Sequence, residues 1–322
     1  MSVHSMLNEA KANKRDEFYT RYMDIENELS RYGGQFRTKT VLCNCDEWSH
    51  SAFFRYFVKN FNRLGLKRLI CTGFSRGSLY PYAVYVDRVR EDGFPVPADG
   101  VSESVMWKLL SGDLTHVAGD FRSGECVRLL DMADIVVTNP PFSLFREFVS
   151  LLMAHGKKFL VIGHQNSMTH KDIFPFIMEN RLWFGYGFKG LAGYFGSVYD
   201  DRAVSSVHKE GMIRVSGVTW YTNLDVRRRH EFLPLVKTYD PELYPKYDGT
   251  DIINVGRTAD IPKDYDGVMG VPITFLYKYC PEQFEIVGKI DSGPVAGYNI
   301  ANPVVDGRTL YKRLAIRKKG SV

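Results

Sequence analysis

Short apolar segments rich in β-branched residues alternate with longer, helix-like segments through the first half of the chain. The strand-like segments are residues 41–45, 67–71, 135–137 and 159–162. Between the first two, the phenylalanines and leucines of residues 51–64 recur at helical spacing, and Gly65 marks the end of that pattern. Strands that alternate with helices predict a parallel sheet covered by helices on both faces, the doubly wound α/β class.

Further along, the pattern continues and then breaks. Residues 101–110 look helical, and Ser143 is placed to cap another helix. Residues 218–223 have the composition of a core strand that could close the first sheet. Frequent prolines and glycines then divide the chain into short pieces. We therefore predict one domain over residues 1–225 and a smaller, loop-rich region over residues 226–322.

Length and composition indicate a folded protein of the cytoplasm. A chain of 322 residues with 44% hydrophobic and 25% charged residues has enough apolar surface for a core, which argues against disorder. Its five cysteines show no CxxC pair and no neighbouring histidines, so we predict neither a disulfide framework nor a metal site. The apolar runs are far shorter than the roughly 20 residues that cross a bilayer, and no signal peptide is recognisable, so we expect no membrane partner.

The most informative motif follows the third strand-like segment. Asn139, Pro140, Pro141 and Phe142 come directly after it, and ligands of open α/β sheets bind just outside the carboxyl ends of the strands. The two prolines make a stiff loop that offers carbonyl acceptors and lacks backbone donors. An amide oxygen, a carbonyl oxygen and the flat face of Phe142 together suit a planar ring with an exocyclic amine, such as adenine.

This donor-free loop also suggests a chemistry. The amine of adenine is a poor nucleophile because its lone pair is delocalised into the ring. Hydrogen bonds from its two N–H groups to the Asn139 amide oxygen and the Pro140 carbonyl would favour a pyramidal, more nucleophilic nitrogen. That nitrogen could then attack the sulfonium methyl group of S-adenosylmethionine in line, without a metal. The simpler alternative is that residues 139–142 form a rigid turn and an ordinary core contact.

Longer stretches of the chain carry a family resemblance. They are DEFYTRYMDIENEL, VLCNCDE, GDFRS, DIVVTNPPFSLFREF, VTWYTNL and DIPKDYDGVMGVPITFLYKYCPEQFEIVG, in this order from residue 16 to residue 288. In these segments the chain resembles the EcoRI-type adenine-specific DNA methyltransferases. The last segment is the most specific of them, because NPP followed by an aromatic residue occurs in amino-group methyltransferases generally.

The resemblance implies a Rossmann-like domain that uses S-adenosylmethionine to methylate N6 of a flipped-out adenine in double-stranded DNA. Residues 226–322 would be its target-recognition region. The motif at residues 139–142 would hold the base, and the cofactor contacts implied are Tyr19, Thr20, Cys43, Asn44, Asp46, Asp120 and Phe121. The resemblance also implies a monomer. It leaves open whether the enzyme belongs to a restriction-modification system with a cognate endonuclease or is an orphan modification enzyme.

Two departures from the usual methyltransferase pattern leave the cofactor contacts open. A glycine-rich turn usually follows the first strand, whereas residues 43–51 contain no glycine. An acidic residue usually follows the second strand, whereas residues 71–74 offer none. Core packing is therefore the alternative to cofactor contact for Cys43 and Cys45, and helix capping is the alternative for Asp120.

Two clusters of basic residues are candidates for DNA contacts. One consists of Arg227, Arg228 and Arg229, and the other, near the C-terminus, includes Lys312 and Arg313. Phosphate contacts supply most of the non-specific affinity of DNA-binding proteins, and a net charge of +5 permits such a partner. Each cluster has an ordinary solvated surface as its alternative.

Two other functions fit part of these observations. The same loop would serve an enzyme that methylates cytosine N4, an RNA base amine or a protein glutamine, because each presents a planar, conjugated amine or amide. The last segment of the resemblance argues against these substrates. The missing glycine turn suggests a non-catalytic DNA-binding module on a methyltransferase fold, and the intact NPPF motif argues against that.

Overall fold

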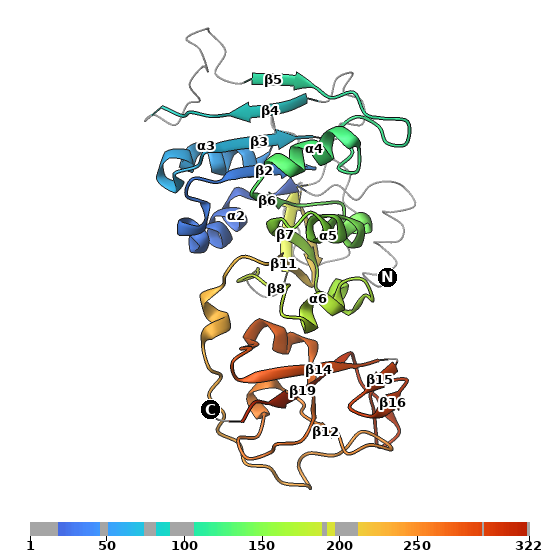
Figure 1. Cartoon of the computed structure of the whole chain (residues 1–322). Helices are drawn as coiled ribbons and strands as arrows, with labels where there is room; N and C mark the ends of the chain where they lie inside the picture. Colours follow the sequence, from blue (N-terminus) through green and yellow to red (C-terminus); the bar gives the residue numbers. More distant parts are fainter. Residues whose placement is uncertain are drawn as a thin grey trace. The chain divides into compact units, whose positions relative to one another are not determined.

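The computed structural model describes residues 19–45, 51–73, 82–90, 106–188, 192–196, 212–291 and 293–320 (Figure 1). By its internal contacts the chain divides into two compact units. Unit 1 comprises Met1–Ile173 and Phe184–Asp225, and unit 2 comprises Phe174–Trp183 and Val226–Val322. The assignment of catalysis to residues 1–225 and of target recognition to residues 226–322 remains a prediction.

Unit 1 is a mixed α/β structure built on one large sheet. In the part of the chain that the structure describes, the strand order is β5-β4-β3-β2-β6-β7-β11-β8. Its strands are β2 (Thr40–Asn44), β3 (Arg68–Thr72), β4 (Tyr82–Val86), β5 (Met106–Leu109), β6 (Ile135–Thr138), β7 (Lys158–His164), β8 (Trp183–Phe184) and β11 (Val218–Thr222). Its helices are α2 (Tyr22–Leu29), α3 (Ala52–Leu64), α4 (Gly124–Met132) and α5 (Phe145–Ala154), with the 3₁₀ turns η1 (Ser30–Phe36), η2 (Phe142–Leu144) and η3 (Gln165–Thr169).

The sheet is parallel at its centre and antiparallel towards its edges. The neighbours β3, β2, β6 and β7 pair in parallel, with α3 between β2 and β3 and α5 between β6 and β7 in the chain. Antiparallel pairing joins β4 to β3, β5 to β4 and β11 to β7. The prediction of a parallel sheet is therefore wrong outside the centre. Only parallel neighbours require a long crossover, usually a helix, and the central strands are the ones that have it.

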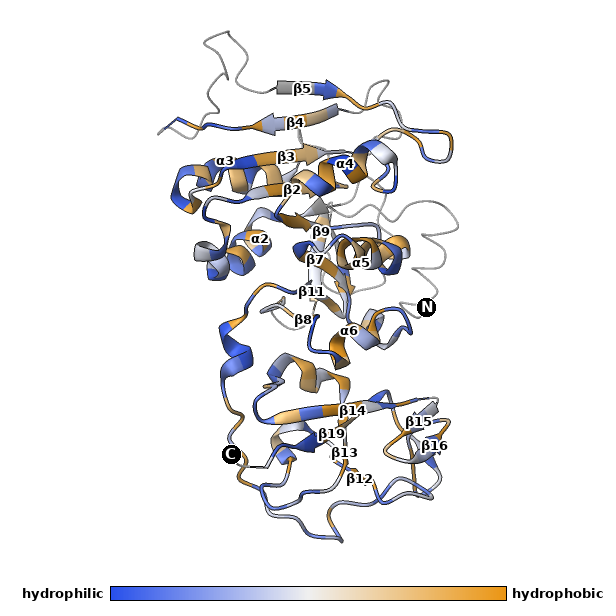
Figure 2. Ribbon diagram, in the orientation of Figure 1, coloured by the Kyte–Doolittle hydropathy of each residue, from blue (hydrophilic) through white to orange (hydrophobic). Residues whose placement is uncertain are grey.

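The centre of the sheet is also the centre of the core. Every residue of β2, β6 and β11 is buried, and Figure 2 shows β2 and β3 as mostly hydrophobic. Helix α3 forms as its sequence predicts: Ser51 accepts a hydrogen bond from the Phe54 backbone N–H at 2.8 Å, and Gly65 ends the helix with φ of 64°. The predicted strand at residues 218–223 is confirmed as β11.

Two local predictions are wrong. Residues 106–109, predicted as part of a helix, form strand β5, because their pairing with β4 overrides a weak helical periodicity. Ser143 does not cap α5, because it lies inside the turn η2. The Leu144 backbone N–H donates to the Pro141 carbonyl at 3.0 Å and closes that turn, so α5 begins at Phe145 without a side-chain cap.

A small sheet with strand order β1-β9-β10 accompanies the large one in unit 1. Its strands are β1 (Tyr19–Thr20), β9 (Ala192–Gly196) and β10 (Met212–Ser216), all paired antiparallel. The chain passes from β10 into β11 of the large sheet through Gly217 alone, which has φ of 71°. A Cβ at this position would also lie 2.7 Å from the His164 ring, so the turn requires glycine.

Unit 2 consists of short strands and 3₁₀ turns. Its described sheet has the order β12-β13-β19-β14, beside the two-stranded pairs β15-β16 and β17-β18. The bounds are α6 (Phe174–Met178), η5 (Arg227–His230), β12 (Ile253–Asn254), η6 (Thr258–Asp260), β13 (Met269–Pro272), η7 (Ile273–Lys278), β14 (Phe284–Ile290), β15 (Gly293–Val295), β16 (Tyr298–Ile300), β17 (Val304–Val305), β18 (Arg308–Thr309) and β19 (Arg313–Lys318). Tyr247, Ile252, Ile290, Val295 and Ala315 belong to its core. Across the described residues of both units, every helix is too short or too polar to span a membrane.

Candidate active site

The carboxyl ends of three neighbouring strands bring the predicted site residues together. Strands β3, β2 and β6 are parallel, so their ends lie at the same edge of the sheet. Asn44, the last residue of β2, is the register partner of Thr72, the last residue of β3. The Thr138 hydroxyl, at the end of β6, donates a hydrogen bond to the Asn44 carbonyl. The NPPF motif follows Thr138 directly, so it begins beside the end of β2.

The NPPF motif itself forms a compact turn at this edge. Pro140 is buried, and Asn139, Pro141 and Phe142 are half-buried. The Pro141 carbonyl is used to close the turn η2, whereas that turn does not use the Pro140 carbonyl. The Phe142 ring lies 6.5 Å from the Phe195 ring of β9, with the two planes at 87°. The motif therefore combines a half-buried asparagine whose amide oxygen is itself enclosed, an acceptor carbonyl and a ring in perpendicular contact with a second aromatic ring.

Buried polar atoms that lack hydrogen bonds gather on the segments around the end of β2. They are Asn44 Oδ1 and Thr72 Oγ1, and neither has a partner in the part of the chain that the structure describes. Leaving a buried donor or acceptor unsatisfied costs about 1–3 kcal/mol, so folded proteins seldom do it without a reason. Their position at the ligand-binding edge of the sheet indicates a polar ligand.

The residue after β2 is a cysteine in a backbone conformation that is usually left to glycine. Cys45 has φ of 62°, the left-handed conformation that glycine adopts at little cost and other residues rarely adopt. Cys43, two residues earlier in β2, is fully buried, as its alternative role in core packing requires. Asp46, predicted as a cofactor contact, lies outside the described residues. The absence of glycine thus does not prevent the chain from turning sharply here.

Asp120 is engaged by Arg122. One carboxylate oxygen accepts hydrogen bonds from the Arg122 backbone N–H and Nε, both at 2.9 Å, and the other accepts from Nη2 at 2.7 Å. Burial by itself would raise the pKa of the Asp120 carboxyl, but these bonds and the charge of the guanidinium hold that pKa below its usual value. The alternative role of Asp120 as a helix cap is filled by Ser123, which accepts from the Cys126 N–H at the start of α4.

The other predicted cofactor residues are Phe121, Tyr19 and Thr20. Phe121 is buried, with its ring 5.0 Å from that of Phe148 on α5. Tyr19 and Thr20 form β1, in which Thr20 pairs with Phe195 of β9. No group of three His, Cys, Asp or Glu side chains suited to a metal ion occurs among the described residues.

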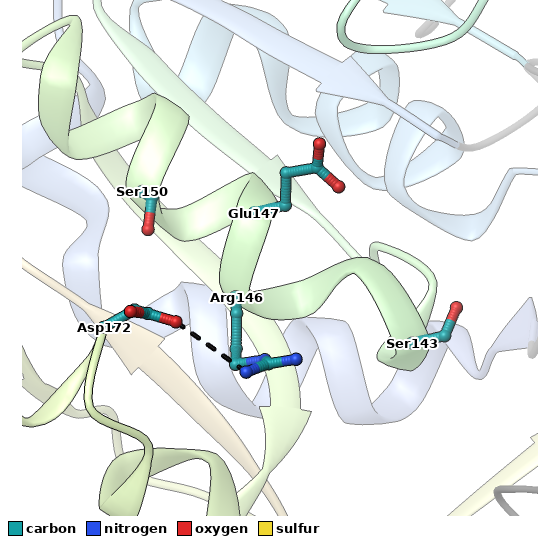
Figure 3. A pocket seen from close by; sticks show the side chains of 5 residues that line it. All are labelled: Ser143, Arg146, Glu147, Ser150 and Asp172. Carbon is teal, nitrogen blue, oxygen red and sulfur yellow. Dashed lines mark ion pairs between the residues drawn. The ribbon is translucent and has the colours of Figure 1, made fainter.

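A polar pocket beside the motif was not predicted from the sequence. It has a volume of about 240 Å³ and is lined by Ser143, Arg146, Glu147, Ser150 and Asp172. Figure 3 shows these side chains, with the ion pair between Arg146 and Asp172 at 3.7 Å. The first four recur every three or four positions, a polar stripe along η2 and α5 that was visible in the sequence. Because Ser143 follows Phe142 directly, the pocket borders the NPPF loop.

The arginines of the first basic cluster lie in very different surroundings. In η5, the Arg227 side chain is 91% exposed, whereas Arg229 is only 7% exposed. The Arg229 guanidinium lies 3.7 Å from the centre of the Trp183 ring and donates a hydrogen bond to the Asn180 side chain. Arg228 is half-buried. The cluster therefore divides into an exposed cation and a buried one.

The second basic cluster is partly buried. Lys312 and Arg313 are both half-buried, and Arg313 begins β19. Burial lowers the pKa of Lys312, and the charge of Asp291 opposes this shift. The Arg313 guanidinium donates to the Tyr311 carbonyl at 3.2 Å. These two cations are therefore more constrained than a disordered basic tail would be.

Comparison with known proteins identifies the family. The model of the family described as adenine-specific methyltransferase EcoRI matches residues 6–319. The chain belongs to this family. It is 42% identical over 99% of its length to the Type II methyltransferase M.EcoRI of Escherichia coli, of which it covers 98%. It is also 38% identical to M.MgeORF184P of Mycoplasma genitalium and 37% identical to M.MpnI of Mycoplasma pneumoniae, both named Type II methyltransferases. These matches cover 97% and 98% of this chain and 98% of each relative. No solved structure matches the chain significantly.

Proposed function

We propose that this protein is a DNA methyltransferase that transfers a methyl group from S-adenosylmethionine to N6 of a flipped-out adenine in duplex DNA. The observation that carries the proposal is the NPPF loop at the carboxyl end of β6, beside the end of β2, in a member of an adenine-specific methyltransferase family. DNA as the substrate is supported by the relatives named Type II methyltransferases, which the chain matches over nearly its full length.

The arrangement of the central strands supports a Rossmann-like catalytic domain in unit 1. The parallel order β3-β2-β6-β7 places the ends of β2, β3 and β6 at one edge, where such folds bind their ligands. Unit 2, with its short strands and basic residues, would then recognise the target sequence. The enzyme would act in the cytoplasm as a monomer on one strand at a time, within a restriction-modification or orphan modification system.

The residues at this edge fit a cofactor with ribose hydroxyls and an amino-acid end. The Asn44 and Thr72 side chains each offer a buried polar atom that lacks a protein partner in the described chain. The left-handed turn at Cys45 lets the backbone approach a ligand, as a glycine turn would. Asp120 would remain an acceptor for the adenine amine while Arg122 keeps it ionised. When bound, S-adenosylmethionine supplies an electrophilic methyl group.

The chain's own groups would prepare the nucleophile. The Asn139 amide oxygen and the Pro140 carbonyl would each accept one N–H of the target amine, and Phe142 would stack on the base. These hydrogen bonds are strongest when the nitrogen becomes pyramidal, so they stabilise the transition state more than the ground state. The nitrogen would take the methyl group that the bound cofactor supplies, and the amine would then release one proton to water.

Exposed cations would hold the DNA while the base leaves the helix. Flipping costs a few kcal/mol, which stacking on Phe142 and phosphate contacts can offset. Arg227 is the most exposed candidate for such contacts, with Arg228, Lys312 and Arg313 half-buried. Arg229, stacked on Trp183, would hold the segment that carries Arg227 and Arg228.

The decisive experiment maps methylation in genomic DNA from cells that express the protein. We expect N6-methyladenine at one short recurring sequence, and its absence with Asn139→Ala, a variant that should still bind the cofactor. In parallel, purified protein is incubated with labelled S-adenosylmethionine and separate DNA, RNA and protein substrates. Label in RNA or protein with unlabelled DNA, or methyl groups on cytosine N4, would refute the proposal. Failure to bind the cofactor in calorimetry would favour a non-catalytic DNA-binding module.

A further inference from the structure

Phe142 has an aromatic partner that lies 53 positions away in the sequence. The Phe195 ring of β9 is 6.5 Å from the Phe142 ring, and the two planes are nearly perpendicular at 87°. Phe195 is fully buried, whereas Phe142 is half-buried. Perpendicular ring pairs are favoured because the positive edge of one ring meets the negative face of the other, so the contact fixes orientation as well as distance.

The strand that carries Phe195 is shaped to hold its ring. Gly193 lies two positions earlier on β9, on the same face of the strand. A Cβ at Gly193 would be 2.5 Å from the Phe195 ring, which is closer than carbon atoms can approach. Glycine therefore leaves the space in which the Phe195 ring lies against its own strand.

Phe195 is in turn supported by the large sheet. Its ring is 6.1 Å from that of Phe188, and Phe188 stacks on Trp220 with the planes at 7°. Trp220 is a fully buried residue of β11. Through these two rings, Phe195 is packed against the buried strand β11, whereas Phe142 stands in the three-residue 3₁₀ turn η2.

We infer that Phe195 is a positioning residue for methyl transfer, which holds the Phe142 ring in the orientation that stacks on the flipped base. This inference rests on the proposed function. Because Phe195 is fully buried, it would act through the Phe142 ring and not by touching the base or the cofactor. Its loss leaves the stacking ring in place but free to turn.

A double-mutant cycle tests whether Phe195 acts through Phe142. The variants are Phe195→Leu, Phe142→Leu and the double variant, each assayed in a single turnover on a duplex that carries the mapped target. We expect Phe195→Leu to slow methyl transfer about two- to tenfold, the range of one aromatic pair. In the Phe142→Leu background the same change should slow transfer less than twofold, because the ring that it positions is already gone. Equal factors in both backgrounds would overturn the inference.

Two further measurements separate positioning from general damage to the fold. A duplex with 2-aminopurine in place of the target adenine should give a weaker fluorescence rise with Phe195→Leu, while the calorimetric Kd for S-adenosylmethionine stays within twofold. The control is Phe184→Leu, another buried phenylalanine of unit 1, whose ring is 5.0 Å from Tyr221. An equal loss of rate in this control would also overturn the inference.

Failure of the inference about Phe195 is distinguishable from failure of the proposed function. If the wild-type protein transfers no label to DNA, the proposed function fails before any variant is compared. If Phe195→Leu does not fold, Phe195→Met replaces it, because methionine fills irregular space without a ring. The same double-mutant cycle then applies. Equal factors in both Phe142 backgrounds, or an equal loss of rate in the Phe184→Leu control, would again overturn the inference.

Discussion

Replacing Cys45 by glycine or alanine measures what the turn after β2 requires of its sequence. With φ of 62°, Cys45 holds a conformation that costs a residue with a Cβ about 1–2 kcal/mol. Glycine avoids this cost but is more flexible in the unfolded chain by about 0.4–1 kcal/mol. The difference predicts that Cys45→Gly is more stable than Cys45→Ala by about 0.8 kcal/mol.

The same pair of substitutions at Cys43 provides the control. Cys43 lies in the extended strand β2, where glycine is less stable than alanine by roughly 0.5–1 kcal/mol. The sign of the glycine–alanine difference should therefore reverse between positions 43 and 45, although both start from cysteine. Urea denaturation of the four variants gives the differences in the free energy of unfolding. A preference for alanine at both positions would refute the argument that backbone conformation governs this turn.

Four other variants test the cofactor edge, the basic cluster and a buried tyrosine. Thr72→Val should weaken S-adenosylmethionine binding in calorimetry about two- to tenfold, the value of one hydrogen bond, without destabilising the ligand-free protein, because Thr72 Oγ1 has no partner there among the described residues. Unchanged affinity would remove Thr72 from the site. Arg227→Gln should reduce the slope of log affinity for DNA against log salt by about 0.9, whereas Arg229→Gln should leave the slope and lower the stability of unit 2. Equal slopes for Arg227→Gln and the wild type would show that Arg227 makes no phosphate contact. Burial raises the pKa of Tyr56 to about 12, against the lowering effect of Arg63. An unfolded tyrosine ionises near pH 10, so the stability present below pH 10 is lost as pH rises towards 12. Tyr56→Phe should make this loss shallower in urea midpoints measured from pH 9 to 11, and an identical pH profile would contradict the assignment.

The sequence predicted those structural features that depend on residues close together in the chain. The glycine that ends α3 directly follows the helical pattern, and NPPF directly follows its strand, so both were recognised. Strand β5 was missed because it is stabilised by β4, more than 20 residues earlier. No local pattern predicts a partner strand at this distance, and the helical periodicity of residues 101–110 was misleading.

The site was predictable in its motif and not in its surroundings. Asn44 and Thr72 lie side by side at the ends of β2 and β3. This placement depends on the register of the two strands, which a single sequence does not reveal. The contact between Phe142 and Phe195 joins the turn η2, which follows a strand of the large sheet, to β9 of the small sheet. Arg229 illustrates the converse, because three adjacent arginines look equivalent in the sequence and only packing against Trp183 distinguishes the buried one.

The assignment of Phe174–Trp183 to unit 2 constrains how unit 2 can be exchanged between this protein and its relatives. Helix α6 buries Phe174 and Ile177 and contacts β14, and Lys289 of β14 lies 5.8 Å from the Phe174 ring. A chimera joined at residue 225 would pair an α6 from one parent with a β14 from the other. Recombination should therefore yield working hybrids mainly when the ten-residue insert travels with the C-terminal segment, so three crossovers are needed where the linear sequence suggests one.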